Sequence, residues 1–293
     1  MDNRALCFFH SADLDGHCSG AIVKHEMGDD VVLRGINYGD TFPWDEVKDR
    51  EVIMVDFSLQ PFSDMVRLHK LSSNFVWIDH HKSAIDEYSE YNADGLPWDG
   101  LREIGKGACE LCWEYFYPTW GDYVPRAVKL LSLYDVWRHD EDEDALPFQF
   151  GMRVRDTYPT HDQAEGIWTT LLSPVGSSTI NQVLREGKTI LKYQEQQNEA
   201  YARSASFVTI LGGFRCIVIN RMITNSQIFD SVWDEDKYDA MVTFGWRKGK
   251  WTFSMYSTSE DIDVSVFCKS MGGGGHKNAS GFQLDELPKG FLK

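Results

Sequence analysis

The stretch ALCFFHSADLDGHCSG, residues 5–20, places polar side chains directly after an apolar run. The run ALCFF is typical of a buried β-strand, and the residues that follow Gly16 are typical of a helix. Between the two stand His10, Asp13 and Asp15. Burying carboxylates and an imidazole at the tip of a strand is unfavourable unless they have a partner. The stretch therefore predicts a strand, a loop that carries a site, and a helix.

The same alternation continues beyond this stretch and indicates the fold class. Nearly continuous apolar runs are expected to form further strands in residues 30–38, 51–58 and 74–81. Amphipathic segments are expected to form helices in residues 18–27, 61–71, 107–117, 123–137 and 161–172. Apolar strands separated by helices are typical of a parallel, doubly wound α/β sheet.

The second part of the chain has a different pattern and is expected to form a second domain. The Ser-, Pro- and Gly-containing stretch 173–181 ends the first domain, which we predict over residues 1–181. The polar segment 182–205 is expected to be a helical connector. Residues 206–293 have the pattern of a β-rich sheet with one short helix and a glycine-rich segment. We therefore predict a smaller α/β domain there.

An excess of acidic residues limits the ligands that the chain is expected to bind. The 293 residues include 45 acidic and 29 basic residues, which gives a formal net charge of −16. Long nucleic acid is bound mainly by Lys and Arg side chains that neutralise phosphates, so we expect no long nucleic acid as a partner. A phosphorylated ligand should be small, or its charge should be met by bound metal.

Several features favour a cytoplasmic protein with reduced thiols. No apolar run approaches the length of a membrane span, about 18–20 residues, so we expect no membrane partner. The N-terminal MDNRALCFF lacks the pattern of a secretory signal, and the six cysteines have irregular spacings. Cys109 and Cys112 have no second Cys pair or nearby His, so we expect core-facing thiols on a helix rather than zinc ligands.

Ligand-type residues stand at the ends of three of the predicted strands. Asp56 follows the third strand, and Asp79, His80 and His81 follow the fourth. Ligands bind outside the carboxyl ends of the strands in an open α/β sheet, so we expect these residues to converge with those after the first strand. Asp135 interrupts an apolar helical pattern, and a buried carboxylate there also needs a partner.

Each of these residues has a simpler interpretation when it is taken alone. Asp15 could cap the helix that follows it, His81 could be a hydrogen-bonded core histidine, and Asp135 could pair with Arg138. Three strand ends that carry such groups together are harder to explain in this way. No basic residue stands among them, and about four carboxylate charges would balance two divalent cations.

The types of ligand indicate the kind of metal and the kind of reaction. Carboxylates and imidazoles without thiolates favour Mn²⁺, with Mg²⁺ or Co²⁺ as alternatives, over structural zinc. Two such ions about 3.5–4 Å apart can generate hydroxide and can stabilise the attacking and leaving oxygens of a phosphoryl displacement. We therefore predict two divalent metal ions.

Five motifs in the chain resemble those of one family. HSADLDG, VDFS, WIDHHKS and LYDVW, in this order, resemble the four motifs of the DHH phosphoesterases. The C-terminal GGGGHKNASGF resembles the glycine-rich motif of the domain that accompanies them. The resemblance spans about residues 6–282, nearly the whole chain. It implies a doubly wound DHH domain and a smaller α/β C-terminal domain, with the active site in the cleft between them.

The resemblance implies two metal sites that share Asp56. The first ion would be bound by His10, Asp13 and Asp56. The second ion would be bound by Asp15, Asp56, His80 and Asp135.

The resemblance also implies roles for residues that do not bind metal. Asp79 would hold and orient His80. His81 would face the substrate phosphate as a charge partner or as a proton donor to the leaving oxygen. His276 would reach a phosphate across the cleft. Backbone N–H groups would approach an anion or a terminal nucleotide at Gly272, Gly273, Gly274 and Gly275. The simpler interpretation of these glycines is a flexible turn.

Two departures from the family pattern bear on the substrate. The spacing His-x-x-Asp-x-Asp in the first motif resembles the nanoRNase-like branch more than the branch that cleaves cyclic dinucleotides. Many relatives carry an Arg-Ser pair on the strand before the glycine segment, whereas this chain has Tyr256 and Ser257. Arg221 is our candidate for the missing guanidinium, and its simpler interpretation is a surface charge.

The function expected from this sequence is that of a metal-dependent phosphodiesterase. It would hydrolyse short oligoribonucleotides (nanoRNA) or dinucleotides from an end, like an exoribonuclease, and release mononucleotides. The alternatives are a 3′-phosphoadenosine 5′-phosphate phosphatase, a phosphodiesterase for cyclic or linear dinucleotides, and a nucleotide-binding protein without catalysis. A pyrophosphatase or a RecJ-like exonuclease fits less well, because the chain lacks a basic cluster in its second domain and is short and acidic. A homodimer is left open.

Overall fold

The computed structural model describes residues 4–92, 95, 97–121, 123–174 and 176–292. The chain forms two compact units, Met1–Leu191 and Lys192–Lys293. The boundary between them lies within α9 (Ser177–Ala205), which is longer than the connector expected from the sequence. Ser177 and its neighbours begin this helix, although their composition is typical of a loop.

The first unit contains a four-stranded parallel sheet with the strand order β2-β1-β3-β4. Its strands are β1 (Ala5–His10), β2 (Val31–Ile36), β3 (Glu51–Val55) and β4 (Asn74–Ile78). Phe9 lies beside Val55, and Val55 lies beside Ile78, so three strands end at the same level. The residues directly after these positions are His10, Asp56 and Asp79. The register therefore brings the predicted site residues to one edge of the sheet.

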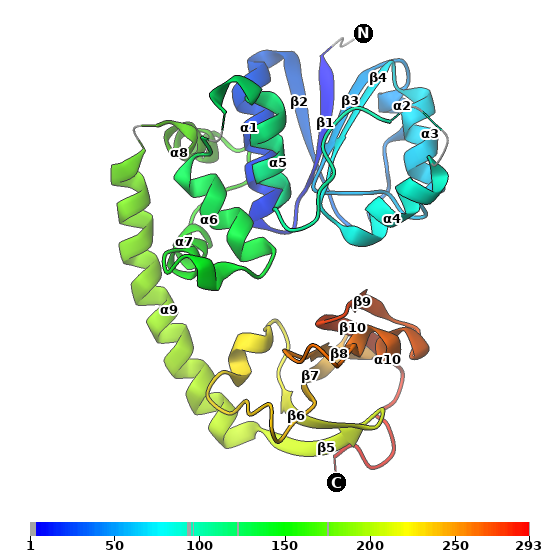
Figure 1. Cartoon of the computed structure of the whole chain (residues 1–293), viewed down its shortest axis with the longest axis vertical. Helices are drawn as coiled ribbons and strands as arrows, with labels where there is room; N and C mark the ends of the chain where they lie inside the picture. Colours follow the sequence, from blue (N-terminus) through cyan, green and yellow to red (C-terminus); the bar gives the residue numbers. More distant parts are fainter. Residues whose placement is uncertain (1–3, 93–94, 96, 122, 175, 293) are drawn as a thin grey trace. The chain divides into compact units, whose positions relative to one another are not determined.

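Helices cover both faces of this sheet, as Figure 1 shows. On one face, Cys7 and Phe9 of β1 pack in a core with α1 (Leu14–Met27) and α5 (Ala108–Phe116). On the other face, Leu6 and Phe8 pack in a core with α3 (Ser63–Leu71) and α4 (Lys82–Tyr91). Residues alternate between the two faces of a strand, so a continuous apolar run is what two covered faces require. The predicted doubly wound α/β fold is confirmed.

Further helices extend the first unit. α6 (Arg126–Asp135), α7 (Ala145–Met152) and α8 (Asp162–Leu172) lie on the side of α1 and α5, whereas α2 (Trp44–Val47) packs beside α3 on the other face. The short 3₁₀ segments of the chain are η1 (Gly28–Asp30), η2 (Pro118–Trp120), η3 (His139–Glu141) and η4 (Ser226–Phe229). The helices α2, α4 and α7 were not predicted from the sequence. α2 has only four residues, and polar or aromatic residues obscure the apolar periodicity of α4 and α7.

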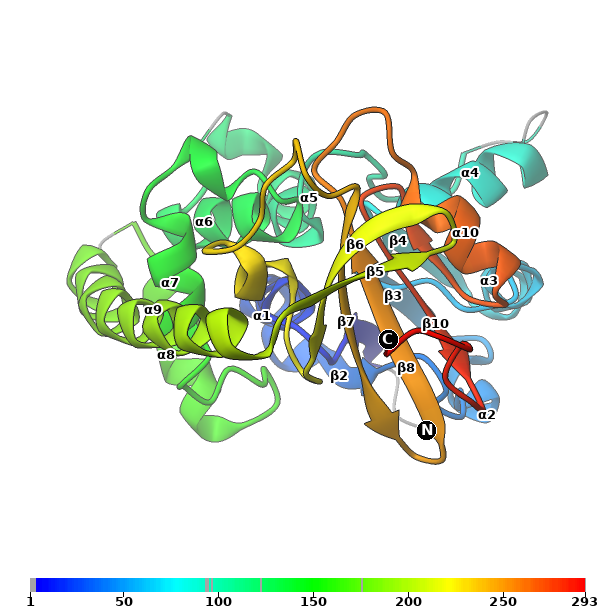
Figure 2. The same ribbon diagram turned by 90° about the horizontal axis from the view of Figure 1, so that it is seen from below.

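The second unit contains a six-stranded mixed sheet with the order β5-β6-β7-β8-β10-β9. Its strands are β5 (Phe207–Leu211), β6 (Phe214–Asn220), β7 (Ala240–Arg247), β8 (Lys250–Tyr256), β9 (Gly274–His276) and β10 (Ala279–Leu284). Figure 2 shows β6, β7 and β8 side by side. The helix α10 (Val264–Ser270) packs on one face through Val264 and Cys268, and Ala202 and Phe229 cover the other.

The cysteines and the helices agree with two simpler expectations. Cys109 and Cys112 lie on α5 and are fully buried, as expected for core-facing thiols. All six cysteines, each within the described ranges, are free thiols. Among the described residues, no helix has an apolar stretch of the length that a bilayer requires.

Candidate metal centre

The loop between β1 and α1 folds back on itself and places two carboxylates beside His10. Asp13 is the N-cap of α1, and its Oδ1 accepts a hydrogen bond from the backbone N–H of Gly16 over 2.9 Å. A Cβ at Gly16 would lie 2.0 Å from the carbonyl oxygen of His10. Only glycine permits this close approach, so Gly16 sets the path of the loop. Asp15 then falls in the first turn of α1.

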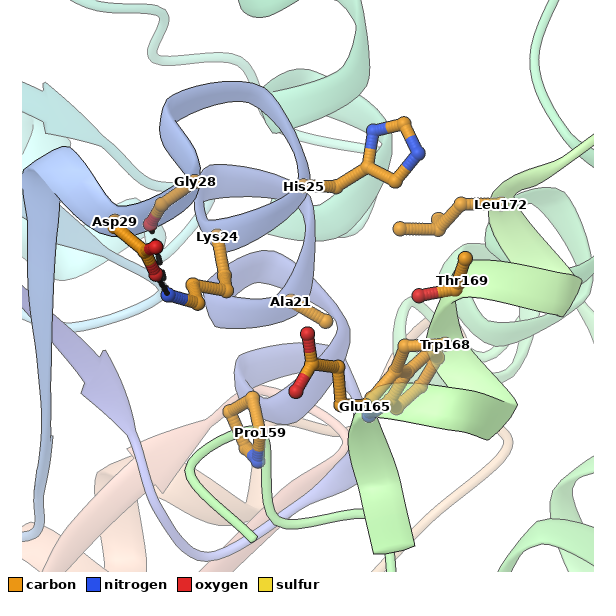
Figure 3. Close-up of a pocket in the computed structure, with 10 residues that line it drawn as sticks. All are labelled: Ala21, Lys24, His25, Gly28, Asp29, Pro159, Glu165, Trp168, Thr169 and Leu172. Carbon is orange, nitrogen blue, oxygen red and sulfur yellow. Dashed lines mark hydrogen bonds and ion pairs between the residues drawn. The ribbon is translucent and has the colours of Figure 1, made fainter. Parts of the chain in front are cut away.

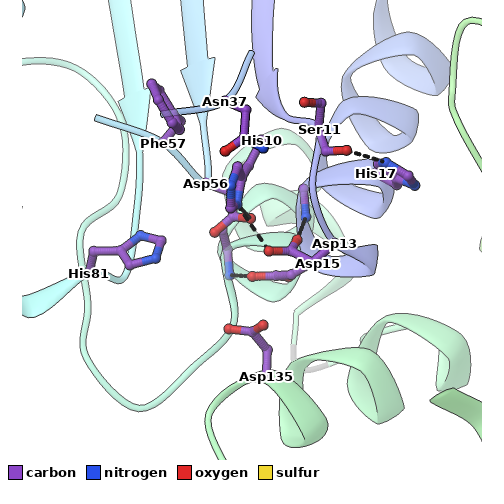
Figure 4. A network of polar contacts seen from close by, with 12 residues as sticks. His10, Ser11, Asp13, Asp15, His17, Asn37, Asp56, Phe57, His81 and Asp135 are labelled. Carbon is purple, nitrogen blue, oxygen red and sulfur yellow. Dashed lines mark hydrogen bonds and ion pairs between the residues drawn. The ribbon is translucent and has the colours of Figure 1, made fainter. Parts of the chain in front are cut away.

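One group of ligand-type atoms forms around His10. The Nδ1 atom of His10 lies 3.0 Å from Asp13 Oδ2 and 3.6 Å from Asp56 Oδ2. The potential ligand atoms of these residues all lie within 4.8 Å of one another, a spacing that could hold a metal ion. Figure 4 shows the three side chains gathered at the end of β1.

A second group forms around His80. The Nε2 atom of His80 lies 3.2 Å from Asp135 Oδ2 and 3.7 Å from Asp15 Oδ2. It also lies 3.4 Å from Asp56 Oδ1. Asp56 therefore faces His10 with one carboxylate oxygen and His80 with the other. The structure brings together all six residues that the sequence predicts as metal ligands, and it places Asp56 between the two groups.

The backbone of Asp56 is held in an unusual conformation. Its φ is 56°, in the left-handed region, and its side chain is almost completely buried. Its backbone N–H donates to the carbonyl of Ile78 over 2.9 Å, which anchors the residue to β4. A left-handed non-glycine residue costs of order 1–3 kcal/mol, and such strain concentrates at functional sites.

Asp15 is fixed by the N-terminus of a second helix. Its Oδ2 accepts from the N–H of Ala108 over 2.7 Å and its Oδ1 from the N–H of Cys109 over 2.8 Å. A Cβ at Gly107 would lie 3.0 Å from Asp15 Oδ1, so glycine permits the close approach of α5. The simpler interpretation of Asp15 is therefore wrong in one respect: Asp13 caps α1, and Asp15 meets the positive end of α5.

A buried polar network that the sequence did not predict lies behind Asp15. The Oγ atom of Ser132 accepts from the N–H of Gly107 over 2.8 Å and donates to Glu110 Oε2 over 2.5 Å. Lys129 Nζ donates to Glu110 Oε1 over 2.7 Å. Ser132 lies on α6, one turn before Asp135. The network therefore joins the helix that carries Asp135 to the helix end that holds Asp15.

Asp79 contacts the ring of His81 rather than that of His80. Its Oδ1 lies 2.7 Å from His81 Nδ1 and accepts the backbone N–H groups of His80 and His81 over 2.7 and 3.1 Å. The expectation that Asp79 orients the His80 ring is thus corrected, because its hydrogen bond to His80 is to the backbone N–H. His81 contributes a ring nitrogen within 4.8 Å of ligand atoms of Asp56 and His80.

The charges of the cluster shift the pKa values of its members. Burial lowers the pKa of His10, but the carboxylates of Asp13 and Asp56 outweigh it and raise the pKa to about 10. Burial and, next, the charge of Asp15 raise the pKa of both Asp56 and Asp135 well above the usual range. Burial likewise opposes a charged His81, but the Asp79 carboxylate raises the pKa of His81 to about 9. The cluster therefore favours added positive charge.

Three buried polar atoms of the cluster are suited to bind divalent cations. His10 Nδ1, Asp56 Oδ2 and His80 Nε2 lie close to other polar atoms of the cluster, but none of these contacts within the described part of the chain has the geometry of a hydrogen bond. Buried polar atoms are rarely left without a partner, and a cation supplies one to each of these nitrogen and oxygen atoms. The donor set of carboxylates and imidazoles fits Mn²⁺ or Mg²⁺.

Asp135 does not pair with Arg138. The guanidinium of Arg138 donates to both oxygens of Glu141 and to the carbonyl of Gly105. Asp135 faces His80 instead, so the simpler interpretation of this residue is wrong.

Part of the glycine-rich segment of the second unit forms an edge hairpin: Gly274 and Gly275 lie in β9, whereas Gly272 lies in the turn before it. β9 pairs with β10, with Gly274 opposite Gly281 and His276 opposite Ala279. A Cβ at Gly273 would lie 2.0 Å from the carbonyl oxygen of Gly281, whereas a Cβ at Gly274 would meet nothing within 4 Å. Two more glycines, Gly272 and Gly275, have φ values of 80° and 137°. His276 is exposed.

Arg221 is not brought to the glycine segment. It follows β6, which is separated from β9 by β7, β8 and β10. Strands lie about 4.8 Å apart, so β6 and β9 are separated by roughly 19 Å across the sheet. The Arg221 guanidinium lies 4.9 Å from the centre of the Tyr201 ring, a cation–π contact that accounts for its position.

A cavity at the other end of α1 does not belong to this site. It has a volume of about 260 Å³ and is lined by Lys24, His25, Glu165 and Trp168 among other residues (Figure 3). Asp15 and Lys24 are nine residues apart on α1, which corresponds to roughly 13 Å along the helix axis.

Comparisons with known proteins bear on the fold. No protein-family model matches the chain. An uncharacterized protein of Acanthamoeba polyphaga mimivirus is 26% identical over 263 residues, which cover 85% of this chain and 56% of that protein. The chain thus spans little more than half the length of this curated relative.

Three solved structures resemble the chain over nearly its whole length. The DHH domain of a member of a family of ribosomal proteins aligns with a TM-score of 0.62 at 15% identity, covering 99% of this chain and 85% of that one. A pGpG-specific phosphodiesterase, PggH, from Vibrio cholerae has a TM-score of 0.53 at 14% identity, with coverages of 96% and 93%.

An exopolyphosphatase-related protein from Bacteroides fragilis also has a TM-score of 0.53, at 12% identity, with coverages of 99% and 89%. At such low identities the likeness concerns the fold. The chain therefore has the fold of DHH-domain proteins with their C-terminal domain.

Proposed function

We propose that the chain is a DHH-family phosphodiesterase that depends on two divalent metal ions, with Mn²⁺ as the preferred ion. The observation that supports this most directly is the pair of ligand groups joined by Asp56. Asp56 lies within 3.6 Å of His10 and within 3.4 Å of His80, and three atoms of these side chains are buried without a hydrogen bond among the described residues. Two bound ions would activate water and neutralise the phosphodiester as negative charge develops on it.

The chain's own residues would hold the substrate and supply a proton. The ring of His81 lies beside the cluster. In the metal-free protein Asp79 outweighs the opposing effect of burial and raises the pKa of His81 to about 9, so Asp79 favours the protonated ring. A protonated His81 can donate to the leaving oxygen of the ester. His276 and the backbone of Gly274 would bind the terminal phosphate or nucleotide of the substrate, because His276 is exposed and Gly274 lies on the edge strand β9.

The proposed substrates are short oligoribonucleotides and dinucleotides, cut to mononucleotides. The net charge of −16 disfavours the long electrostatic contact that long nucleic acid needs. The similarity in fold to a phosphodiesterase specific for pGpG, itself a linear dinucleotide, supports the same class of substrate. A linear dinucleotide from a cyclic precursor is therefore the second candidate, ahead of 3′-phosphoadenosine 5′-phosphate.

The test compares purified wild-type protein with Asp56→Asn on a panel of substrates in Mn²⁺. The panel contains dinucleotides, longer RNA, 3′-phosphoadenosine 5′-phosphate, cyclic dinucleotides and short-chain polyphosphate. We expect wild type to cleave dinucleotides fastest and Asp56→Asn to lose turnover while it stays folded. Asp86→Asn is the matched control, because Asp86 is exposed and pairs with Lys82, its neighbour in α4.

Three outcomes would contradict the proposal. Turnover by metal-free Asp56→Asn would show that the cluster does not bind catalytic metal ions. Preferred cleavage of polyphosphate would change the substrate class. Nucleotide binding by wild type without any turnover would make the chain a binding protein.

A further inference from the structure

The helix α6 ends in a Schellman motif whose left-handed position holds a tryptophan. The N–H of Arg138 donates to the carbonyl of Leu133 over 2.8 Å, and the N–H of Trp137 donates to that of Tyr134 over 3.2 Å. Trp137 has a φ of 58°. Glycine is the usual residue at this position, because a side chain there meets its own backbone. A tryptophan at this position is therefore unfavourable for the helix end itself.

Burial in a core does not account for this tryptophan. Trp137 is 51% exposed, and its ring centre lies 5.9 Å from that of the half-buried His139. Trp137 follows Asp135 by two residues, so their α-carbons lie at most about 7 Å apart. A strained and exposed aromatic residue thus follows Asp135, a member of the second ligand group, by two residues in the chain.

A second exposed aromatic residue stands beside the first ligand group. Tyr38 follows β2 at the carboxyl edge of the sheet and is 49% exposed. Its ring centre lies 5.9 Å from that of His10, edge to face, and 4.7 Å from that of Phe57. These contacts hold the Tyr38 ring at a fixed place against a predicted metal ligand.

Tyr38 contacts the cluster at one end, and Trp137 follows in the chain the residue at its other end, Asp135. Contacts run from Tyr38 to His10, then through Asp56 to His80 and on to Asp135, which Trp137 follows. Figure 4 shows His10 and Asn37, the neighbour of Tyr38, at one end of the cluster and Asp135 at the other.

We propose that Tyr38 and Trp137 are stacking platforms for the two bases that flank the scissile phosphodiester of a dinucleotide. This inference rests on the proposed function and extends it, because it makes the bases, not only the phosphates, part of what the site recognises. Stacking on an aromatic ring needs no basic residue and tolerates any base, which suits an acidic protein. A polyphosphate has no group that such rings could bind.

The experiment uses the full chain in Mn²⁺ with two substrates, the dinucleotide ApA and the same diribose phosphodiester without bases. Trp137→Gly should raise KM for ApA about ten-fold, the loss expected for one stacked base, and leave KM for the base-free diester unchanged. The melting temperature of Trp137→Gly should equal or exceed that of wild type, because glycine suits the left-handed position. Tyr38→Leu should likewise raise KM for ApA and leave KM for the base-free diester unchanged.

Conservative variants and a remote tryptophan complete the design. Tyr38→Phe and Trp137→Phe should keep KM for ApA near the wild-type value, because they retain an aromatic face. Trp120→Leu is the matched control: Trp120 is 45% exposed in the same unit but contacts Trp113 and Tyr123 rather than the cluster.

Two results would overturn the inference and leave the proposed function standing. The first is an unchanged KM for ApA in both Trp137→Gly and Tyr38→Leu. The second is an equal rise of KM for ApA and for the base-free diester, with a lower melting temperature, which would make these rings packing residues. Failure of wild type to cleave ApA at all would instead remove the proposed function.

Discussion

The hydroxyl of Ser132 donates to the buried carboxylate of Glu110 over 2.5 Å, and this contact supports the helix end that holds Asp15. Ser132→Ala removes the donor and leaves Glu110 Oε2 with an unmet acceptor in the core. The free energy of unfolding should fall by about 1–3 kcal/mol, the usual cost of a buried unsatisfied group. Because the N-terminus of α5 also loses its support at Gly107, Mn²⁺ should bind more weakly.

Denaturant unfolding and calorimetric titration with Mn²⁺ measure both effects. Ser89→Ala serves as the control, because the Ser89 hydroxyl donates to the carbonyl of Ile85 within its own exposed helix. Unchanged Mn²⁺ affinity in a destabilised Ser132→Ala would mean that the network supports the fold alone.

Binding of Mn²⁺ should release protons, because the ion and the proton compete for the same atom of His10. In the metal-free protein the carboxylates of Asp13 and Asp56, against the opposing effect of burial, raise the pKa of His10 to about 10, so the ring is protonated at pH 7. A metal ligand must be the neutral ring, so about one proton should leave His10 with the first ion. Affinity should therefore fall as the pH falls.

Calorimetry in two buffers of different ionisation enthalpy counts the released protons. His25→Gln should not change the number, since His25 bonds Tyr117 far along α1 from the cluster. An apparent binding enthalpy that is the same in both buffers would argue against His10 as a ligand.

Asp79→Asn should shift the pH dependence of turnover through His81. Burial disfavours the charged ring, and the Asp79 carboxylate outweighs this effect and raises the pKa of His81 to about 9. An amide in its place can still accept the backbone N–H groups of His80 and His81 but carries no charge. The pKa of His81 should then fall to about 6.5 or below, the value of an unpaired or buried imidazole.

A proton donor is active only below its pKa, so the alkaline fall in kcat should lie at a lower pH in Asp79→Asn than in wild type. The kcat–pH profiles of wild type and Asp79→Asn measure the shift. If both profiles fall at the same alkaline pH, His81 is not the donor.

The sequence predicts much of the first unit because its signals are local. The apolar runs before His10, Asp56 and Asp79 mark the strands, and parallel strands bring their carboxyl ends to one edge. The ligand groups follow from this topology. The role of Asp15 at the start of α5 does not, because Ala108 lies more than 90 residues away and nothing near Asp15 indicates it.

Other features were missed because they depend on packing between distant segments. Asp79 contacts the ring of His81 and not that of His80 because of the side-chain rotamers of these residues, and a sequence motif does not specify rotamers. The hairpin of β9 was hidden by its glycines, which have a low propensity for strands. The left-handed backbone at Trp137 is visible only in the Schellman hydrogen bonds of α6.

Gly273, directly before β9, and Gly274, its first residue, separate a structural effect from an effect on substrate binding. A Cβ at Gly273 would lie 2.0 Å from the carbonyl of Gly281, so Gly273→Ala should disrupt the β9–β10 pairing and cost about 1–3 kcal/mol. A Cβ at Gly274 would meet nothing within 4 Å, so Gly274→Ala should change stability by less than about 0.5 kcal/mol. If the backbone of Gly274 approaches the terminal nucleotide, the added methyl group should nevertheless raise KM for dinucleotides. Thermal unfolding and steady-state kinetics on both variants distinguish these effects, and Gly274→Ala with wild-type stability and wild-type KM would place the substrate away from this strand.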